Sequence, residues 1–238
     1  ELASMLPIIA LNPKPHEKIL DLCSAPGSKT TQAASMMNNT GLIIANEVSM
    51  GRLKILASNL EKCGVTNTII TRKEGSALCL KLKNAGLSGL TQNQREEHER
   101  NRGSLVFDKI LVDAPCSGEG TLRSSPKTYL MWNIKTIKAL PRIQKQLIAS
   151  AIEVLKTKGE LVYSTCTHAP EENEGVVSAI LQEFPNLKLK EISLPIKTRK
   201  GIKTWEDKEY EEQIKYACRI YPQDNNTEGF FLAKFVKK

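Results

Sequence analysis

The stretch KILDLCSAPGSKT, residues 18–30, decides the fold of this chain. Its first five residues are mostly aliphatic, as in a buried strand, and residues 30–37 continue in a helical pattern. The tight turn between them directs backbone N–H groups and the start of the helix toward one point, where Gly27 lets a ligand approach closely. The stretch therefore predicts a strand–turn–helix unit that holds a nucleotide-like ligand at its turn.

Strand patterns rich in β-branched and aliphatic residues alternate with helical patterns along the chain. Helices are expected at residues 1–11, 30–37, 49–63 and 134–156. The last of these is expected to break or restart at Pro141 and to stop at Lys158 and Gly159. Strands are expected at residues 18–22, 42–46, 68–71, 109–112, 160–164, 188–192 and 230–236. The alternation predicts an α/β, doubly wound, Rossmann-like fold with a mostly parallel seven-stranded sheet, in which the last two strands form an antiparallel pair with one antiparallel edge strand.

The length of 238 residues allows one sizeable core but not two ordinary domains, so we expect a single domain over residues 1–238. Residues 84–103 form a polar stretch without an apolar stripe, which we interpret as an insertion into that domain. The chain opens without a methionine in what reads as the middle of a helix. We therefore expect it to be a fragment of a longer protein.

The charge balance favours a polyanionic partner. Lys and Arg total 34 against 26 Asp and Glu, which gives a formal charge of +8. This balance favours nucleic acid, although a solvated lysine-rich surface would produce the same number. Aromatic residues make up 5% of the chain, which argues against a sheet that stacks bases across its face.

The six cysteines contain no C-x-x-C spacing, so we expect no metal site. Without a secretory leader or a small disulfide-rich scaffold, we expect a reducing intracellular compartment: the cytoplasm or, in a eukaryote, the nucleus or nucleolus. No apolar run approaches the roughly 20 residues of a membrane span.

An acid follows the second expected strand. Glu47 lies about twenty residues after the glycine turn, where doubly wound folds place a carboxylate that binds ribose hydroxyls. The turn has no glycine four residues before Gly27-Ser28-Lys29, which disfavours a phosphate-binding P-loop, and a strict G-x-G-x-x-G is absent. Kinases, GTPases and nicotinamide enzymes are therefore disfavoured.

Two cysteines follow strands that should end at the ligand-binding edge of the sheet. One is Cys116 in DAPCSG, residues 113–118, and the other is Cys166 in YSTCT, residues 163–167. A phosphatase loop starting at Cys116 would need Arg at the position of Leu122. Two thiols beside a nucleotide-like ligand suggest group transfer through a covalent intermediate.

Three separated motifs, at residues 21–30, 113–121 and 163–167, together resemble the signatures of the RNA cytosine-5 methyltransferases of the Nol1/Nop2/Sun family. The family motif C-A-A-P-G-G-K-T corresponds here to CSAPGSKT, and the similarity continues to TEGFF at residues 227–231. The resemblance implies a class I methyltransferase fold and S-adenosylmethionine as cofactor. The residues it implies for cofactor binding are Cys23, Ser24, Ala25, Pro26, Gly27, Ser28, Lys29, Glu47, Arg52, Glu74 and Asp113, with Glu74 replacing the usual aspartate.

The same resemblance implies the catalytic roles. Cys166 would attack carbon 6 of cytosine, and Cys116 would assist release of the product. Asp113 would bond to the ring nitrogen and exocyclic edge of the base, with Lys29 orienting the cofactor or Asp113. The chemistry needs a nucleophile because carbon 5 of cytosine does not take a methyl group unaided.

The expected partner is RNA, and the protein is expected to be a monomer. Arg123, Lys127, Arg142 and Lys145 are the basic residues expected to contact the RNA backbone, although surface charges of this kind are commonly only solvated. Gln144 matches a family helix position near the site, with an ordinary surface glutamine as an equal alternative. The turn resembles rRNA enzymes somewhat more than tRNA enzymes. A DNA or small-molecule methyltransferase and a non-catalytic RNA-binding scaffold remain as alternatives.

Overall fold

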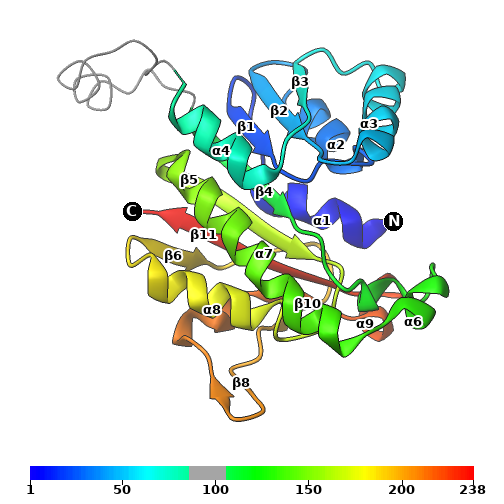
Figure 1. Ribbon diagram of the computed structural model, residues 1–238, viewed down its shortest axis with the longest axis vertical. Coiled ribbons are helices and arrows are strands. Elements are labelled where there is room, and N and C mark those ends of the chain that lie inside the picture. Colours follow the sequence, from blue (N-terminus) through cyan, green and yellow to red (C-terminus); the bar gives the residue numbers. More distant parts are fainter. Residues whose placement is uncertain (86–105) are drawn as a thin grey trace.

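The computed structural model describes residues 1–85 and 106–238. Most of the expected insertion at residues 84–103 therefore lies outside the described residues. Within them, the centre of the molecule is a nine-stranded sheet in the order β3-β2-β1-β4-β5-β11-β10-β7, with β6 paired to β11 (Figure 1).

Five neighbouring strands of this sheet are parallel. They are β3 (Thr68–Thr71), β2 (Leu42–Asn46), β1 (Lys18–Asp21), β4 (Phe107–Asp113) and β5 (Leu155–Thr165). The last strand in the sequence, β11 (Phe230–Lys237), lies antiparallel beside β5. On its other side β11 pairs with β10 (Cys218–Ile220) and with β6 (Leu187–Lys190), while β7 (Arg199–Lys200) borders β10. A separate hairpin joins β8 (Thr204–Trp205) to β9 (Lys208–Glu209).

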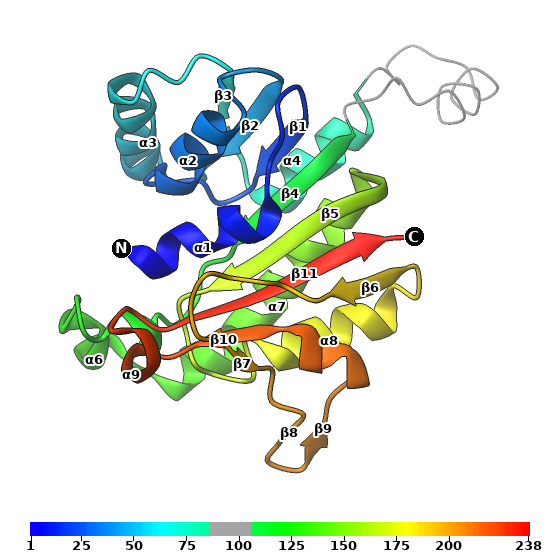
Figure 2. The same cartoon turned by 180° about the vertical axis from the view of Figure 1, so that it is seen from behind.

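Helices cover both faces of the sheet (Figures 1 and 2). One face carries α4 (Gly75–Lys83), α7 (Ile134–Glu153) and α8 (Glu174–Glu183), and the other carries α1 (Leu2–Leu11), α2 (Ser28–Met36) and α3 (Met50–Lys62). Shorter helical turns are η1 (Glu119–Thr121), α6 (Lys127–Met131), η2 (Glu212–Tyr216) and α9 (Pro222–Asn225). Each of the six longer helices, α1, α2, α3, α4, α7 and α8, buries apolar side chains against the sheet, which confirms the doubly wound α/β fold with a mostly parallel sheet.

The expected strands are all present, but some sequence predictions were incomplete or wrong. Strands β10 and β7 and helix α4 were not predicted. The expected break at Pro141 was wrong, because α7 runs unbroken through this residue. The expected helix stop at Lys158 and Gly159 was also wrong. The helix ends at Glu153, and Lys158, with φ of 63°, lies inside β5, which shifts its register against β4.

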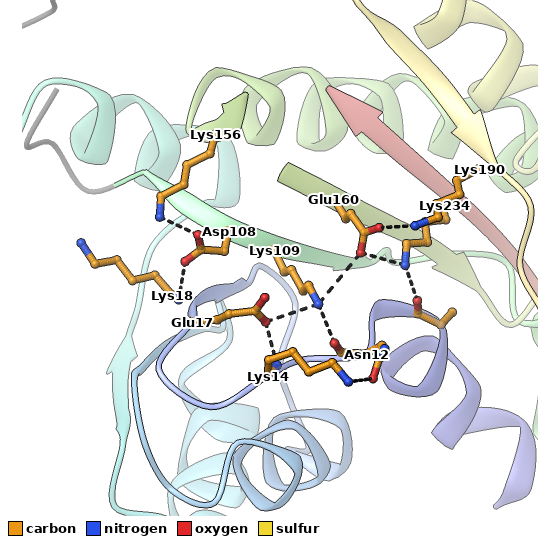
Figure 3. Close-up of polar contacts among 11 residues, drawn as sticks. Asn12, Lys14, Glu17, Lys18, Asp108, Lys109, Lys156, Glu160, Lys190 and Lys234 are labelled. Carbon is orange, nitrogen blue, oxygen red and sulfur yellow. Dashed lines mark hydrogen bonds and ion pairs between the residues drawn. The ribbon is translucent and has the colours of Figure 1, made fainter. Parts of the chain in front are cut away.

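The amino ends of β4 and β5 meet the end of α1 in a cluster of ion pairs (Figure 3). Lys234 of β11 lies 2.8 Å from Glu160 and donates to the carbonyl of Ala10 at 2.8 Å. Lys109 of β4 donates to the carbonyl of Asn12 at 2.5 Å. Both lysines are buried, and burial lowers the pKa of Lys234 although Glu160 opposes this. The two ammonium groups thus bind the last carbonyls of α1, where the helix dipole favours positive charge.

Candidate active site

The expected site residues converge at the opposite edge of the sheet, where the parallel strands end. Asp113 is the last residue of β4, Cys116 follows it in a loop, and Cys166 directly follows β5. Lys29 lies in the first turn of α2. This edge is where open parallel sheets bind their ligands.

The turn between β1 and α2 is fixed by its own backbone. Ser24 donates its N–H to the carbonyl of Asn46 at 2.9 Å, and the N–H of Gly27 reaches the carbonyl of Ser24 at 2.8 Å. Gly27 has φ of 106°, and a Cβ there would approach Leu56 Cδ1 to 3.0 Å, so glycine is required. Among the described residues, no side chain caps the start of α2, so its first N–H groups can serve an anionic or polar ligand.

Glu47 is a buried carboxylate at the end of β2, with 2% exposure. One oxygen accepts the N–H of Ser49 at 2.7 Å, and the other lies 3.2 Å from the guanidinium of Arg52. Arg52 also donates to the carbonyl of Ala25 at 2.5 Å. Arg52 therefore ties the acid to the glycine turn. A carboxylate held in this way, beside an uncapped helix start, fits the ribose and methionine groups of S-adenosylmethionine.

Glu74 lies at the start of α4 and caps that helix. Its carboxylate accepts from the backbone N–H groups of Ser76 at 3.0 Å and Ala77 at 2.8 Å. Burial raises the pKa of Glu74, but hydrogen bonds from Ser76 and Ala77 outweigh it, so the pKa is lowered. Contact of Glu74 with a cofactor stays a prediction.

Asp21, at the end of β1, is fully buried beneath the turn. Thr30 donates to its Oδ2 at 2.7 Å, and its Oδ1 has no hydrogen-bond partner among the described residues. Burial raises the pKa of Asp21 to about 6, with Asp113 adding to the rise and Lys29 opposing it. The sequence placed Asp21 in the motif without assigning it a role.

Lys29 and Asp113 form an ion pair at the centre of the site. Lys29 Nζ lies 2.8 Å from Asp113 Oδ2, and Ser164 donates its hydroxyl to Asp113 Oδ1 at 2.7 Å. Burial lowers the pKa of Lys29, but Asp113 outweighs this and the pKa is raised. The lysine therefore stays charged beside the thiols.

The two predicted thiols are in contact, with Cys116 Sγ 3.3 Å from Cys166 Sγ. The hydrogen bond from Cys116 lowers the pKa of Cys166, and the positive charge of Lys29 acts in the same direction. The same hydrogen bond, together with burial, raises the pKa of Cys116. Either sulfur could donate in this contact, and the opposite pKa shifts favour Cys166 as the thiolate and Cys116 as the donating thiol. Burial raises the pKa of Cys23, a third thiol under the turn.

The loop that carries Cys116 rests on two buried polar side chains, Gln144, which the resemblance had placed near the site, and Glu172, to which sequence reasoning gave no role. Glu172 accepts from the N–H of Ser117 at 3.1 Å and from Gln144 Nε2 at 2.8 Å. Gln144 Nε2 also donates to the carbonyl of Pro115 at 3.0 Å. Gln144 is fully buried, which excludes the alternative of an ordinary surface glutamine. Gln144 and Glu172 lie 28 residues apart in the sequence, so no local pattern predicts their hydrogen bond, although the family resemblance had pointed to Gln144.

The four basic residues expected to bind RNA lie in two groups. Arg123 and Lys127 are exposed around η1 and α6, just beyond the Cys116 loop. Arg142 and Lys145 lie on α7, where Lys145 lines a separate hollow with Glu171 and other residues. Their contact with RNA stays a prediction.

Comparison with known proteins identifies the family. A family model described as 16S rRNA methyltransferase RsmB/F matches residues 8–236. The chain belongs to this family. The resemblance to RNA cytosine-5 methyltransferases is thereby confirmed. Relatives of this chain include a "tRNA (cytosine(49)-C(5))-methyltransferase" from Pyrococcus abyssi, which is 41% identical over all of this chain and 69% of its own length.

Other relatives are longer. The "Ribosomal RNA small subunit methyltransferase F" of Vibrio cholerae is 36% identical over 100% of this chain and 44% of its own length. The human "28S rRNA (cytosine(4447)-C(5))-methyltransferase" is 37% identical over 99% of this chain and 26% of its own length. The present chain thus spans less than half the length of each of these two relatives.

Solved structures agree with the family assignment. A methyltransferase homologue from Pyrococcus horikoshii superposes with a TM-score of 0.79 at 35% identity, covering all of this chain and 67% of that one. NSun6 from the same organism, solved with SFG, gives a TM-score of 0.75 at 33% identity, covering 99% and 52%. In the described part of this RsmB/F chain, no helix is long and apolar enough to cross a membrane, and no cluster of three or more His, Cys, Asp or Glu could hold a metal.

Proposed function

We propose that this chain, as a single catalytic domain, uses S-adenosylmethionine to form 5-methylcytosine in RNA, with rRNA favoured over tRNA. Family membership and relatives named as rRNA and tRNA cytosine-C(5) methyltransferases support the reaction and the substrate class. The observation that carries the mechanism is the pair of touching thiols beside the Lys29–Asp113 ion pair.

The cofactor would be held by the turn at residues 23–28, by the first N–H groups of α2 and by Glu47. The geometry supports this, because the helix start has no side-chain cap and Glu47 is a buried carboxylate tied to the turn through Arg52. When bound, the sulfonium supplies an electrophilic methyl group. The residues of the chain perform the remaining steps.

Cys166 is the proposed nucleophile. Its thiolate adds to carbon 6 of cytosine, forming a C–S bond as the double bond between carbons 5 and 6 opens and electron density moves to carbon 5. Lys29 and the Cys116 S–H favour this thiolate. Asp113 is proposed to bond to the ring nitrogen and exocyclic edge of the base, stabilising charge as it develops.

Release reverses the addition. After methylation, a base removes the proton from carbon 5, the electron pair of that C–H bond restores the double bond, and the C–S bond breaks with its electrons returning to Cys166. Cys116 lies 3.3 Å from that sulfur and donates to it, so that the leaving thiolate is stabilised. Removing this donor should slow release more than attack.

The test compares two single variants on total ribosomal RNA with S-adenosylmethionine. Cys116→Ala should accumulate a protein–RNA adduct that survives a denaturing gel, whereas Cys166→Ala should form none. Cys63→Ala, at an exposed cysteine, is the control and should behave like the wild type. The reverse pattern for Cys116 and Cys166 would show that their roles are exchanged.

The alternative activities predict different results in the same assay. DNA cytosine methyltransferases attack with the cysteine that follows proline, which here is Cys116, so a DNA enzyme would not need Cys166. Methyl transfer to DNA in preference to RNA would support that class. A non-catalytic scaffold would produce no 5-methylcytidine detectable by mass spectrometry of the product nucleosides.

A further inference from the structure

An open hollow of about 750 Å³ lies at the same edge of the sheet as the thiols. It is formed around η1 and α6, which lie beyond the carboxyl ends of β4 and β5 in both views (Figures 1 and 2). The residues that line it are Glu119, Leu122, Tyr129, Leu130, Trp132 and His168. Nothing in the proposed mechanism uses this hollow.

The hollow is built onto the chain segment that carries Cys166. His168 follows Cys166 by two residues, so their Cα atoms are at most about 7 Å apart. Glu119 Oε2 accepts from the hydroxyl of Thr167 at 3.2 Å, and its Oε1 accepts from Trp132 Nε1 at 2.7 Å. One carboxylate therefore fixes the indole of Trp132 relative to the residue next to the nucleophile.

The walls present flat aromatic surface to solvent. Tyr129 is 75% exposed, Trp132 is 50% exposed and Leu130 is 82% exposed. Large apolar side chains clustered at the surface mark an interaction site. His168 stacks on Tyr221 with ring centroids 5.2 Å apart and planes 8° apart, so its ring is held rigidly. Burial lowers the pKa of His168, and Arg219 adds to this although Glu119 opposes it.

We propose that this hollow binds the nucleobase adjacent to the target cytosine, by stacking on Trp132 and its neighbours. The inference rests on the proposed function and names a second subsite for its RNA. Exposed Arg123, next to the lining residue Leu122, and exposed Lys127, the first residue of α6, bring positive charge to the segments that form the hollow, which suits the phosphates of a nucleotide rather than an apolar peptide. When the target base leaves its stack, its neighbour loses a stacking partner, and an aromatic wall beside Cys166 replaces it.

The two tryptophans of the chain allow a direct test, because they can be isolated one at a time. Trp205 lies in the β8–β9 hairpin, apart from α6 in both views (Figures 1 and 2). In Trp205→Phe the only indole is Trp132, and titration with a short oligocytidylate should quench its fluorescence. In the matched variant Trp132→Phe, the remaining Trp205 should show no quenching. Inorganic polyphosphate carries the same kind of charge without bases and should quench neither.

Activity provides the second readout. Trp132→Ala should lower kcat/KM for RNA by about 5-fold to 150-fold, the range for loss of one base–aromatic stack, while the affinity for S-adenosylmethionine stays unchanged. Trp132→Phe keeps an aromatic ring and should recover most of this loss. Recovery by phenylalanine separates stacking from a role of the indole N–H in holding Glu119.

The outcomes separate this inference from the proposed function. If the wild type methylates RNA but Trp132 is not quenched and Trp132→Ala keeps full kcat/KM, the stacking subsite is wrong and the proposed function stands. If the wild type methylates no RNA, the proposed function is wrong. Quenching of Trp132 that grows with protein concentration without RNA would show that a second copy occupies the hollow, which overturns the inference.

Discussion

Replacing Asp21 by Asn should stabilise the protein at neutral and alkaline pH. Asp21 is 2% exposed, one of its oxygens has no partner among the described residues, and burial raises its pKa from the usual 3.8 to about 6. One pKa unit corresponds to about 1.4 kcal/mol, so ionised Asp21 costs the folded state about 3 kcal/mol. Asn has nearly the shape of the neutral acid and can still accept the hydrogen bond from Thr30.

The sign of the pH dependence follows from the raised pKa. Between pH 3.8 and about pH 6 the folded state binds the proton more tightly than the unfolded chain, so the stability that depends on it is lost as pH rises through this window. The advantage of Asp21→Asn in free energy of unfolding should therefore grow by about 2 kcal/mol between about pH 4.5 and pH 8.

Urea unfolding of wild type and variant at a series of pH values measures this difference. Only the change of this stability difference with pH is compared with the prediction, because any effect of the introduced amide on packing is the same at every pH and cancels. Asp108→Asn is the matched control at the opposite edge of the sheet. Burial raises the pKa of Asp108, but its bonds to Lys156 and to the backbone of Lys18 outweigh this and the pKa is lowered, so the stability difference between Asp108→Asn and wild type should change only as pH falls below about 4 and should stay nearly constant from pH 4.5 to 8. A stability difference between Asp21→Asn and wild type that stays constant from pH 4.5 to 8 would refute the reasoning.

Three further perturbations test other parts of the molecule. Arg219 and Glu174 form a buried ion pair, 3% and 0% exposed and 2.5 Å apart, so Arg219→Met should lower the free energy of unfolding in urea by about 3–5 kcal/mol. Adding Glu174→Gln removes the unpaired charge and should recover part of this loss. An equal loss in the double variant would contradict this. Lys234→Met removes a donor to the end of α1, so hydrogen exchange of the α1 amides should accelerate more than exchange in β1. Lys29→Met removes a positive charge that favours the Cys166 thiolate, so alkylation of Cys166 by iodoacetamide, followed by mass spectrometry, should shift to higher pH. An unchanged dependence of alkylation on pH would exclude this role of Lys29.

Much of the fold was predictable because its information is local. The parallel strands are short aliphatic runs bounded by turns, and each is recognisable within its own segment. Strands β10 and β7 have three and two residues, too few for a pattern to emerge. The break predicted at Pro141 failed because α7 buries apolar side chains on both sides of the proline, Ile137 before it and Leu147 of the core after it. Tertiary packing outweighs the loss of one helical hydrogen bond.

The candidate active site, like the fold, has parts that local sequence predicts and parts that it does not. Cys116 and Cys166 could be expected as neighbours because adjacent parallel strands end at one edge of the sheet. The hydrogen bond between Glu172 and Gln144 that supports the Cys116 loop could not be expected, since these residues meet only when α7 packs beside the segment before α8. The hollow beside Trp132 is likewise a product of three segments. Sequence motifs thus located the reacting groups, while the groups that orient them depend on tertiary contacts.

The position of β11 has a consequence for synthesis on the ribosome. It is the final strand in chain order, yet it separates β5 from β6 and β10 in space. Until residues 230–237 emerge from the exit tunnel, β6 has no strand to pair with, β10 can pair only with β7, and the growing chain exposes the unpaired side of β5. The first five strands can therefore assemble during translation, but β6 and β10 must wait for residues 230–237 before they can join the sheet.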